Sequence, residues 1–348
     1  MAVDTGKRVR KREYDTAARR RTLQKADETW REGRAFVPTN SGDANWMRRH
    51  GRESDFKRIE PGVYVRQSAW NDLDVAQREL LTIRGLAEQG AVKGFWCFSA
   101  ALIRGLEVPF PLLARRYLVC SNIPSTSCAD VSIAKADRVG PLECVDGVHV
   151  TSFWRTVEDC LLKAPFGMGL AIADSALRLS GETAEQLEQR LARDAARRHG
   201  LRRALAVASY ADGLSENGGE SRFRAFFIMN GFEIPRLQVE FKDPLDQKRT
   251  YRVDYLWERK DGTMLIGELD GMDKYLGDAG DGSKVSVKAF ADERQRESHL
   301  TMLGYPVLRF SFAELHNPEQ LCSKLERAGV PRRIGWADAW SEEWNTSR

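Results

Sequence analysis

Alternating apolar and polar residues mark two strands in the last third of the chain. Residues 251–257 (Tyr-Arg-Val-Asp-Tyr-Leu-Trp) and 264–269 (Met-Leu-Ile-Gly-Glu-Leu) carry this period-two pattern in β-forming residue types, which predicts half-buried strands. The elements expected here are a helix at 220–230, strands at 237–241, 251–257 and 264–269, a helix at 289–303 and a strand at 307–312. This order describes a mixed sheet flanked by helices.

The front of the chain has helical patterns before a short β element. Residues 22–34 and 44–50 have helical patterns, and residues 58–65 predict a turn at Pro61-Gly62 that leads into a strand. This order suits a winged helix-turn-helix, although other small domains share it.

The middle of the chain mixes helices and short strands. The patterns predict helices at 75–89, 98–105, 151–162, 169–179 and 184–211 and strands at 117–120, 131–134 and 148–151. In the helix at 98–105, we expect Ser99 to be the N-cap and Gly105 to end the helix. The last helix is expected to break or bend near Gly200, and its many arginines predict either a solvated face or a basic groove.

Together these patterns predict an α/β chain with a mixed α+β arrangement. Its parts are a basic N-terminal arm (1–34), a winged-helix-like DNA-binding region (35–70), a middle region with a helical connector (71–212), a C-terminal mixed-sheet domain (213–330) and a Trp-rich C-terminal helix (331–348). Trp336, Trp340 and Trp344 lie four residues apart and therefore on one face of a helix. We expect this face to dock onto the protein, and an exposed surface for a partner is the alternative.

Composition and charge narrow the class of protein. Hydrophobic residues at 42% can fill cores, while charged residues at 30% and the lack of a long apolar run argue against a membrane protein. The charged N-terminus has no signal-like apolar segment, so we expect a cytoplasmic protein with reduced cysteines. Residues 1–34 hold 11 Lys and Arg residues against 6 Asp and Glu residues. Such an arm either contacts nucleic-acid phosphates or is a solvated tail.

The candidate chemistry is acidic. Glu268 and Asp270 are two residues apart on one predicted strand, so their side chains should lie on one side, and Asp254 can join them from a neighbouring strand. Three such carboxylates repel one another unless a cation or a proton neutralises them. Oxygen ligands suit Mg²⁺ or Mn²⁺. With Lys274 nearby to add positive charge, the cluster predicts phosphodiester hydrolysis.

Residues 215–315 resemble the Vsr-like branch of the PD-(D/E)XK nuclease superfamily. Four segments carry the resemblance in order: Glu220-Ser-Arg-Phe-Arg, Tyr251-Arg-Val-Asp-Tyr, Leu265-Ile-Gly-Glu-Leu-Asp-Gly, and Glu293-Arg-Gln-Arg-Glu with the strand after Leu303. It implies a restriction-endonuclease-like fold in which Glu220, Asp254, Glu268 and Lys274 are catalytic. Asp254 and Glu268, with Asp270 as a third group, would bind the metal.

The sequence departs from the superfamily pattern at one position. Where a Glu-x-Lys is expected, the chain has Glu268-Leu269-Asp270, and residues 272–275 (Met-Asp-Lys-Tyr) stand where the branch often has a histidine. Lys274 is the nearby residue that can supply the missing positive charge. The departure bears on activity, and it leaves the predicted fold unchanged.

Residues 20–215 resemble the AbiEi-like antitoxins of type IV toxin–antitoxin systems. Three segments carry the resemblance: Pro61-Gly-Val-Tyr-Val, Phe98-Ser-Ala-Ala-Leu-Ile-Arg-Gly-Leu and Arg155-Thr-Val-Glu-Asp-Cys-Leu. It implies DNA binding by the front domain, repression of the protein's own operon and a cognate toxin as partner. In a helix-turn-helix, residues 44–50 would enter the major groove. Asn45, Arg48 and Arg49 would then contact DNA, and Arg58 on the wing would contact phosphate.

Two classes of function remain open from the sequence. The first is a metal-dependent endonuclease that the front domain brings to DNA, with the sequence leaving DNA or RNA open as its substrate. The second is a non-catalytic, AbiEi-like repressor whose nuclease fold is a binding module. A lysine placed over a bound metal favours the enzyme, whereas a site that binds no metal favours the repressor.

Overall fold

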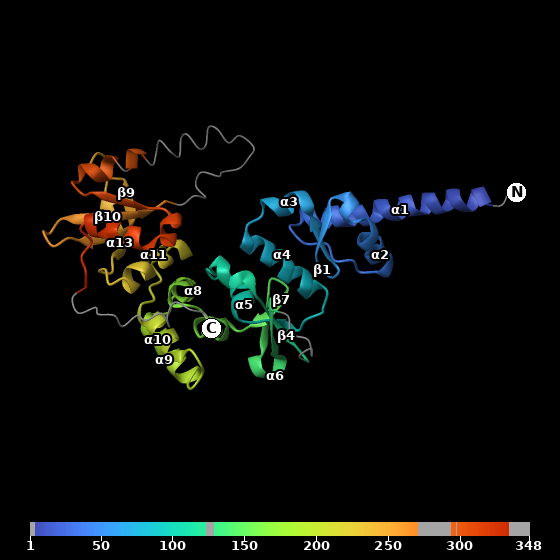
Figure 1. Ribbon diagram of the computed structural model, residues 1–348, viewed down its shortest axis with the longest axis horizontal. Coiled ribbons are helices and arrows are strands. Elements are labelled where there is room, and N and C mark those ends of the chain that lie inside the picture. The colour runs from blue at the N-terminus through green and yellow to red at the C-terminus, as the bar shows by residue number, and fades with distance from the viewer. Residues whose placement is uncertain (1–3, 123–128, 271–293, 297, 334–348) are drawn as a thin grey trace. The chain divides into compact units, whose positions relative to one another are not determined.

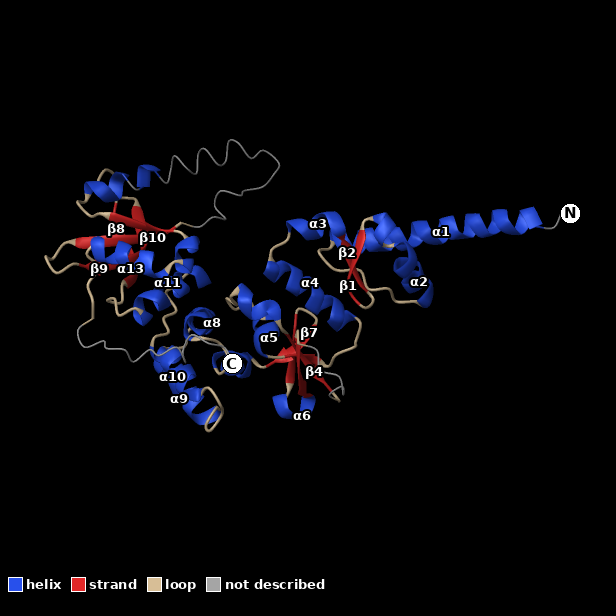
Figure 2. Cartoon of the chain, viewed as in Figure 1, coloured by secondary structure: helices blue, strands red, loops and turns tan. Residues whose placement is uncertain are grey.

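The computed structural model of the chain describes residues 4–122, 129–270, 294–296 and 298–333. The structure is of the predicted α/β class, with three sheets in this part of the chain (Figures 1 and 2). The chain divides into two compact units, Met1–Asp159 and Cys160–Arg348. No helix among the described residues is long and apolar enough to cross a membrane. Lys274 and the predicted Trp-rich helix lie outside the described residues.

The first unit begins with helices and a β-hairpin, in the predicted order. Its elements are α1 (Asp4–Arg31), α2 (Ser41–His50), the 3₁₀ helix η1 (Arg52–Ser54), β1 (Phe56–Glu60), β2 (Val63–Arg66) and α3 (Gln67–Asp72). Strands β1 and β2 are antiparallel, and Gly62 takes the positive φ of 77° that their tight turn requires. Phe36 bridges to Tyr64, and both side chains pack with Met47 of α2 in one core. The helix and the hairpin therefore share a single small core.

The rest of the first unit surrounds a five-stranded mixed sheet. Its elements are α4 (Val75–Glu88), β3 (Gly94–Phe95), α5 (Cys97–Ile103), η2 (Phe110–Ala114), β4 (Arg116–Cys120), β5 (Val131–Lys135), α6 (Ala136–Val139), β6 (Leu142–Val145), β7 (Val148–Thr151) and α7 (Phe153–Leu161), which crosses into the second unit. The strand order is β5-β4-β3-β7-β6. The prediction that Ser99 caps α5 is wrong, because the helix starts earlier with Trp96 at its N-cap. Ser99 Oγ instead accepts a hydrogen bond from the Tyr117 backbone amide at 2.9 Å.

The second unit begins with four helices: α8 (Phe166–Ser180), α9 (Ala184–Asp194), α10 (Leu201–Ser209) and α11 (Gly218–Met229). The predicted break near Gly200 separates α9 from α10. Gly200 has a φ of 89°, and a Cβ there would lie 2.1 Å from the Leu162 carbonyl oxygen. A buried ion pair joins α8 to α11, with Arg224 Nη2 at 2.6 Å from both carboxylate oxygens of Asp174. Burial raises the pKa of Asp174, and Arg224 opposes that shift.

The sheet of the second unit has four strands in the order β11-β10-β9-β8. The strands are β8 (Arg236–Lys242), β9 (Thr250–Glu258), β10 (Met264–Leu269) and β11 (Val307–Phe310), followed by η4 (Phe312–His316) and α13 (Pro318–Arg327). The first three are antiparallel neighbours, while β10 and β11 are parallel and residues 294–296 and 298–302 between them are helical. The predicted order of elements is confirmed, although the last strand ends at Phe310 rather than at residue 312.

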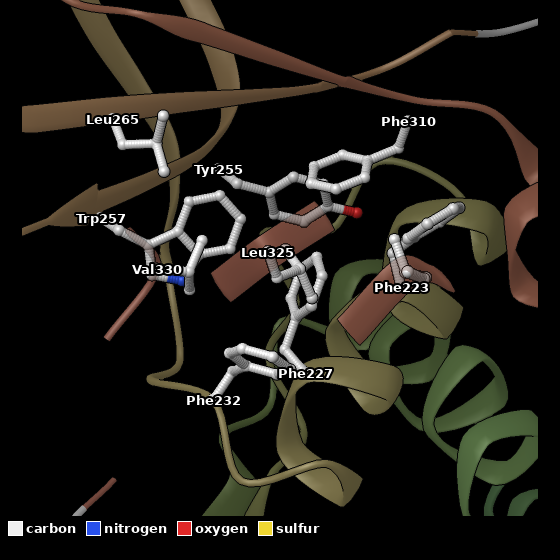
Figure 3. Close-up of a cluster of buried hydrophobic side chains, with 10 residues drawn as sticks. Phe223, Phe227, Phe232, Tyr255, Trp257, Leu265, Phe310, Leu325 and Val330 are labelled. Carbon is white, nitrogen blue, oxygen red and sulfur yellow. The ribbon is translucent and has the colours of Figure 1, made fainter. Parts of the chain in front are cut away.

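Aromatic side chains pack α11 against this sheet. Phe223 and Phe227 of α11 pack against Tyr255 and Trp257 of β9 and Phe310 of β11 in a buried cluster (Figure 3). Aromatic side chains bury large apolar areas and prefer such tilted and edge-on contacts. The start of α11 is consequently held at a fixed position beside the middle of β9.

Candidate functional site

Asp254 and Glu268 lie on adjacent strands, as predicted. Strands β9 and β10 pair from Met264 with Glu258 through Gly267 with Tyr255, and Asp254 and Glu268 are the next residue of each strand beyond that last pair. Asp254 Oδ2 accepts a hydrogen bond from the backbone amide of Leu269 at 2.8 Å. Glu268 is buried while Asp254 is half-buried.

The same row continues onto the outer strands of the sheet. Gln238 lies between the paired positions 237 and 239 of β8 and thus opposite Asp254, while Glu268 pairs with Arg309 of β11. Gln238 and Arg309 therefore flank Asp254 and Glu268 on the two outer strands. Gln238 has a φ of 51°, a left-handed conformation that is costly for a residue with a side chain. Such local strain is often found at functional sites.

Glu220 in the first turn of α11 reaches this row through Gln238. Its Oε2 accepts hydrogen bonds from Gln238 Nε2 at 3.0 Å and from the Glu216 amide at 2.8 Å, and its Oε1 accepts one from Asn217 Nδ2 at 2.7 Å. A carboxylate at a helix N-terminus is also favoured by the helix dipole. Burial raises the pKa of Tyr255 well above its ordinary value, and the negative charges of Glu220 and Asp254 raise it further. That tyrosine therefore lies close to both carboxylates.

Arginines neutralise the two remaining acidic groups. Arg296 Nη2 lies 2.7 Å from Glu268 Oε1. Asp270, which directly follows β10, pairs with Arg309. The repulsion expected from the sequence is real, but these guanidinium groups relieve it in the folded chain.

The site is smaller than the cluster expected from the sequence. In the described parts of the chain, no group of three or more Asp, Glu, His or Cys side chains is placed to hold a metal ion. Magnesium sites, however, commonly use only one or two carboxylates, with waters and substrate phosphates as the other ligands. Asp254 and Glu268, on adjacent strands, are the two carboxylates that such a site would use. Lys274, the expected phosphate contact, lies outside the described residues.

The predicted DNA-contacting residues of the first unit all lie on its exposed surface. Asn45, Arg48 and Arg49 are exposed on α2, whose opposite side buries Asp43 and Met47. Asn45 Oδ1 accepts a hydrogen bond from Arg48 Nη2 at 3.0 Å. This face of α2 is basic and contains side chains that can reach phosphates and base edges.

Arg58 is exposed on β1, in the hairpin that follows α2. An ion pair between Glu60 of the hairpin and Arg116 of the larger sheet connects the two. Arg116 of β4 donates to Glu60 Oε1 at 2.7 Å and to both oxygens of Glu79 at 2.8 and 2.9 Å. Arg116 therefore holds the hairpin and α4 in fixed positions within the first unit.

The sequence patterns did not identify Arg296 and Gln238 as residues of the C-terminal site. Arg296 precedes Leu300 by four residues, a helical spacing that puts it on the core-facing side, and this spacing is a signal that was available. Gln238 gave no such signal, because its left-handed backbone and its contact with Glu220 depend on strand pairing.

Comparison with known protein families and with curated proteins finds no match for the chain. Its function therefore has to be argued from the site itself.

Proposed function

We propose that this is a DNA-binding protein whose C-terminal unit hydrolyses phosphodiester bonds with Mg²⁺ or Mn²⁺. The observation that carries the proposal is the placement of Asp254 and Glu268 on the adjacent strands β9 and β10, one residue beyond the pair of Tyr255 with Gly267, with Leu269 N at 2.8 Å from Asp254 Oδ2. The expected resemblance to Vsr-like PD-(D/E)XK nucleases supports the same chemistry.

Each residue of the site has its own proposed role. Asp254 and Glu268 would hold the metal, which when bound neutralises phosphate charge and makes its bound water more acidic. Glu220, held by three hydrogen-bond donors, would orient a water ligand from the start of α11. Lys274 would contact the scissile phosphate, and Asp270 would keep Arg309 in position through their ion pair.

DNA binding by the first unit is the other half of the proposal. Helix α2 and the β1–β2 hairpin follow one another as a recognition helix and wing do in winged helix-turn-helix domains. We propose that α2 enters the major groove with Asn45, Arg48 and Arg49, that Arg58 contacts phosphate, and that the basic arm at 1–34 adds sequence-independent affinity.

The test is metal-dependent cleavage of single- and double-stranded DNA and RNA by matched variants. Asp254→Asn and Glu268→Gln keep the size of the side chain and remove its charge, and both should abolish cleavage. Asp261→Asn is the control, because Asp261 lies exposed in the turn between β9 and β10. Equal cleavage by the wild type and Asp254→Asn would reject the site.

One observation favours a second function. Arg296 and Arg309 already neutralise Glu268 and Asp270, so the folded chain needs no metal to hold these carboxylates together. A non-catalytic, AbiEi-like repressor that binds DNA and a cognate toxin would have this property. Absence of cleavage on every substrate, together with absence of metal binding, would establish this alternative over the enzyme.

A further inference from the structure

Arg296 forms an ion pair with Glu268, one of the two proposed metal ligands. Its Nη2 donates to Glu268 Oε1 at 2.7 Å and to the Arg252 carbonyl oxygen at 2.6 Å. The Arg296 side chain is only 20% exposed, and that of Glu268 is 7% exposed. The guanidinium is therefore a partly buried group placed directly against the site.

Two anchors fix the helical segment that carries Arg296. Leu300 is 1% exposed and packs with Val253, Leu256 and Ile266 of the sheet. Since Arg296 and Leu300 are four residues apart, both lie on the side of the helix that faces the sheet. The position of the guanidinium is thus determined by the core.

The second anchor is a buried polar cluster formed by Asp243, Tyr251 and His299. Asp243 Oδ2 accepts a hydrogen bond from Tyr251 Oη at 2.6 Å and lies 3.0 Å from His299 Nδ1. Burial alone would raise the pKa of Asp243, but the hydrogen bonds from Tyr251 and from the Leu245 amide outweigh burial and hold that pKa well below its ordinary value. An ionised Asp243 therefore holds His299, three residues beyond Arg296, against the strand.

A metal ion and Arg296 compete for the same carboxylate. A divalent cation bound by Glu268 takes over the negative charge that the guanidinium now neutralises. Arginine stays protonated at any pH that proteins tolerate, and it has five N–H donors but no acceptor. Once released from Glu268, its fork matches the oxygens of a phosphate group, which accept hydrogen bonds in pairs.

We infer that Arg296 is a phosphate-binding cation of this site: it pairs with Glu268 in the metal-free protein and moves to the scissile phosphate when metal binds. This inference rests on the proposed phosphodiester hydrolysis. It places on Arg296 the charge that a Glu-x-Lys lysine would supply, at the point where the chain has Glu268-Leu269-Asp270. In the reaction, the water oxygen forms a bond to phosphorus and the bond to the leaving oxygen breaks. Water gives up one proton and the leaving oxygen gains one, while Arg296 donates hydrogen bonds and keeps its protons.

Two measurements on the full chain test the inference. Calorimetric titration with Mn²⁺ alone gives the metal affinity, and cleavage at saturating Mn²⁺ gives the rate. Arg296→Ala should bind Mn²⁺ about 3- to 10-fold more tightly, because the competing cation is gone, yet cleave about 10²–10³-fold more slowly, as expected for loss of one transition-state donor. Arg296→Lys keeps the charge without the fork and should recover part of the rate. Arg294→Ala, exposed on the same helical segment, is the control and should leave both quantities within about twofold of the wild type, the scatter expected for a surface substitution.

The decisive result is that Arg296→Ala binds Mn²⁺ more tightly than the wild type and yet cleaves more slowly. A variant Arg296→Ala that loses both metal affinity and rate would show a structural role only and would overturn the inference. Tighter Mn²⁺ binding with an unchanged rate would also overturn it, by showing that Arg296 merely occupies Glu268. A wild type that binds no Mn²⁺ would instead refute the proposed function, and the inference would fail with it.

Discussion

Replacing Gln238 by glycine and by alanine separates two contributions that β8 combines at this position. The residue has a φ of 51°, and its side chain donates to Glu220 Oε2 at 3.0 Å. A left-handed backbone costs a residue with a Cβ about 1–2 kcal/mol. A hydrogen bond to a charged group contributes about 1.5–3 kcal/mol. Alanine loses the hydrogen bond and keeps the backbone cost, whereas glycine loses the bond and removes that cost.

The comparison between the two variants therefore reports the backbone conformation alone. We expect both to unfold more easily than the wild type, with Gln238→Gly more stable than Gln238→Ala by about 1 kcal/mol. In an ordinary strand the order is reversed, because glycine is about 0.5–1 kcal/mol less stable than alanine. The sign of the difference thus decides the question, independently of the size of the hydrogen-bond contribution.

Urea denaturation followed by tryptophan fluorescence measures this difference. With a typical slope of about 1–3 kcal/mol per molar urea, 1 kcal/mol moves the midpoint by about 0.3–1 M. A midpoint for Gln238→Gly below that of Gln238→Ala would refute the left-handed conformation at Gln238. It would also remove the reason that this side chain reaches Glu220.

Three further predictions follow from other parts of the structure. Arg224→Ala should lower the free energy of unfolding by about 3–5 kcal/mol, because it leaves the carboxylate of Asp174 buried without its partner; an Arg224→Met, Asp174→Leu double variant should be more stable than Arg224→Ala in the same denaturation assay. Because the pKa of Asp243 is lowered on folding, its contribution is present above the ordinary aspartate pKa of about 3.9 and is lost as the pH falls below it. Asp243→Asn should therefore flatten the fall in unfolding free energy between about pH 5 and pH 2, and an unchanged pH profile would contradict the account. Arg48→Ala and Arg49→Ala should each weaken duplex DNA binding and reduce the slope of log affinity against log salt by about 1, measured by fluorescence anisotropy; an unchanged slope in both would exclude these arginines from the interface.

Local pattern was sufficient for the strands that carry the site. The predicted strand at 264–269 has the same bounds as β10, and residues 251–257 lie within β9, because alternation and β-forming residues agree along both. The adjacency of the two strands that carry Asp254 and Glu268 was expected from those two runs. Strand β3, which is only two residues long, is too short to show any period, and it could not be found this way.

The charge balance of the site could not be derived from local pattern. It depends on Arg296, which reaches Glu268 from a helical segment 28 residues away in sequence, and on Arg309, which reaches Asp270 from the parallel strand β11. The sequence showed the acidic residues and their mutual repulsion. Which cations neutralise them is decided by tertiary packing, so a metal ion was the simplest expectation from the sequence alone.

The most direct test of the central claim is calorimetric titration of Mn²⁺ into the wild type, Asp254→Asn and Glu268→Gln. If these two carboxylates form a metal site, the wild type binds one Mn²⁺ and each substitution weakens binding at least tenfold, which is about 1.4 kcal/mol. Asp261→Asn, which alters an exposed turn carboxylate, binds as the wild type does. Undetectable binding by the wild type, or equal affinity in all four proteins, would contradict a metal site at Asp254 and Glu268.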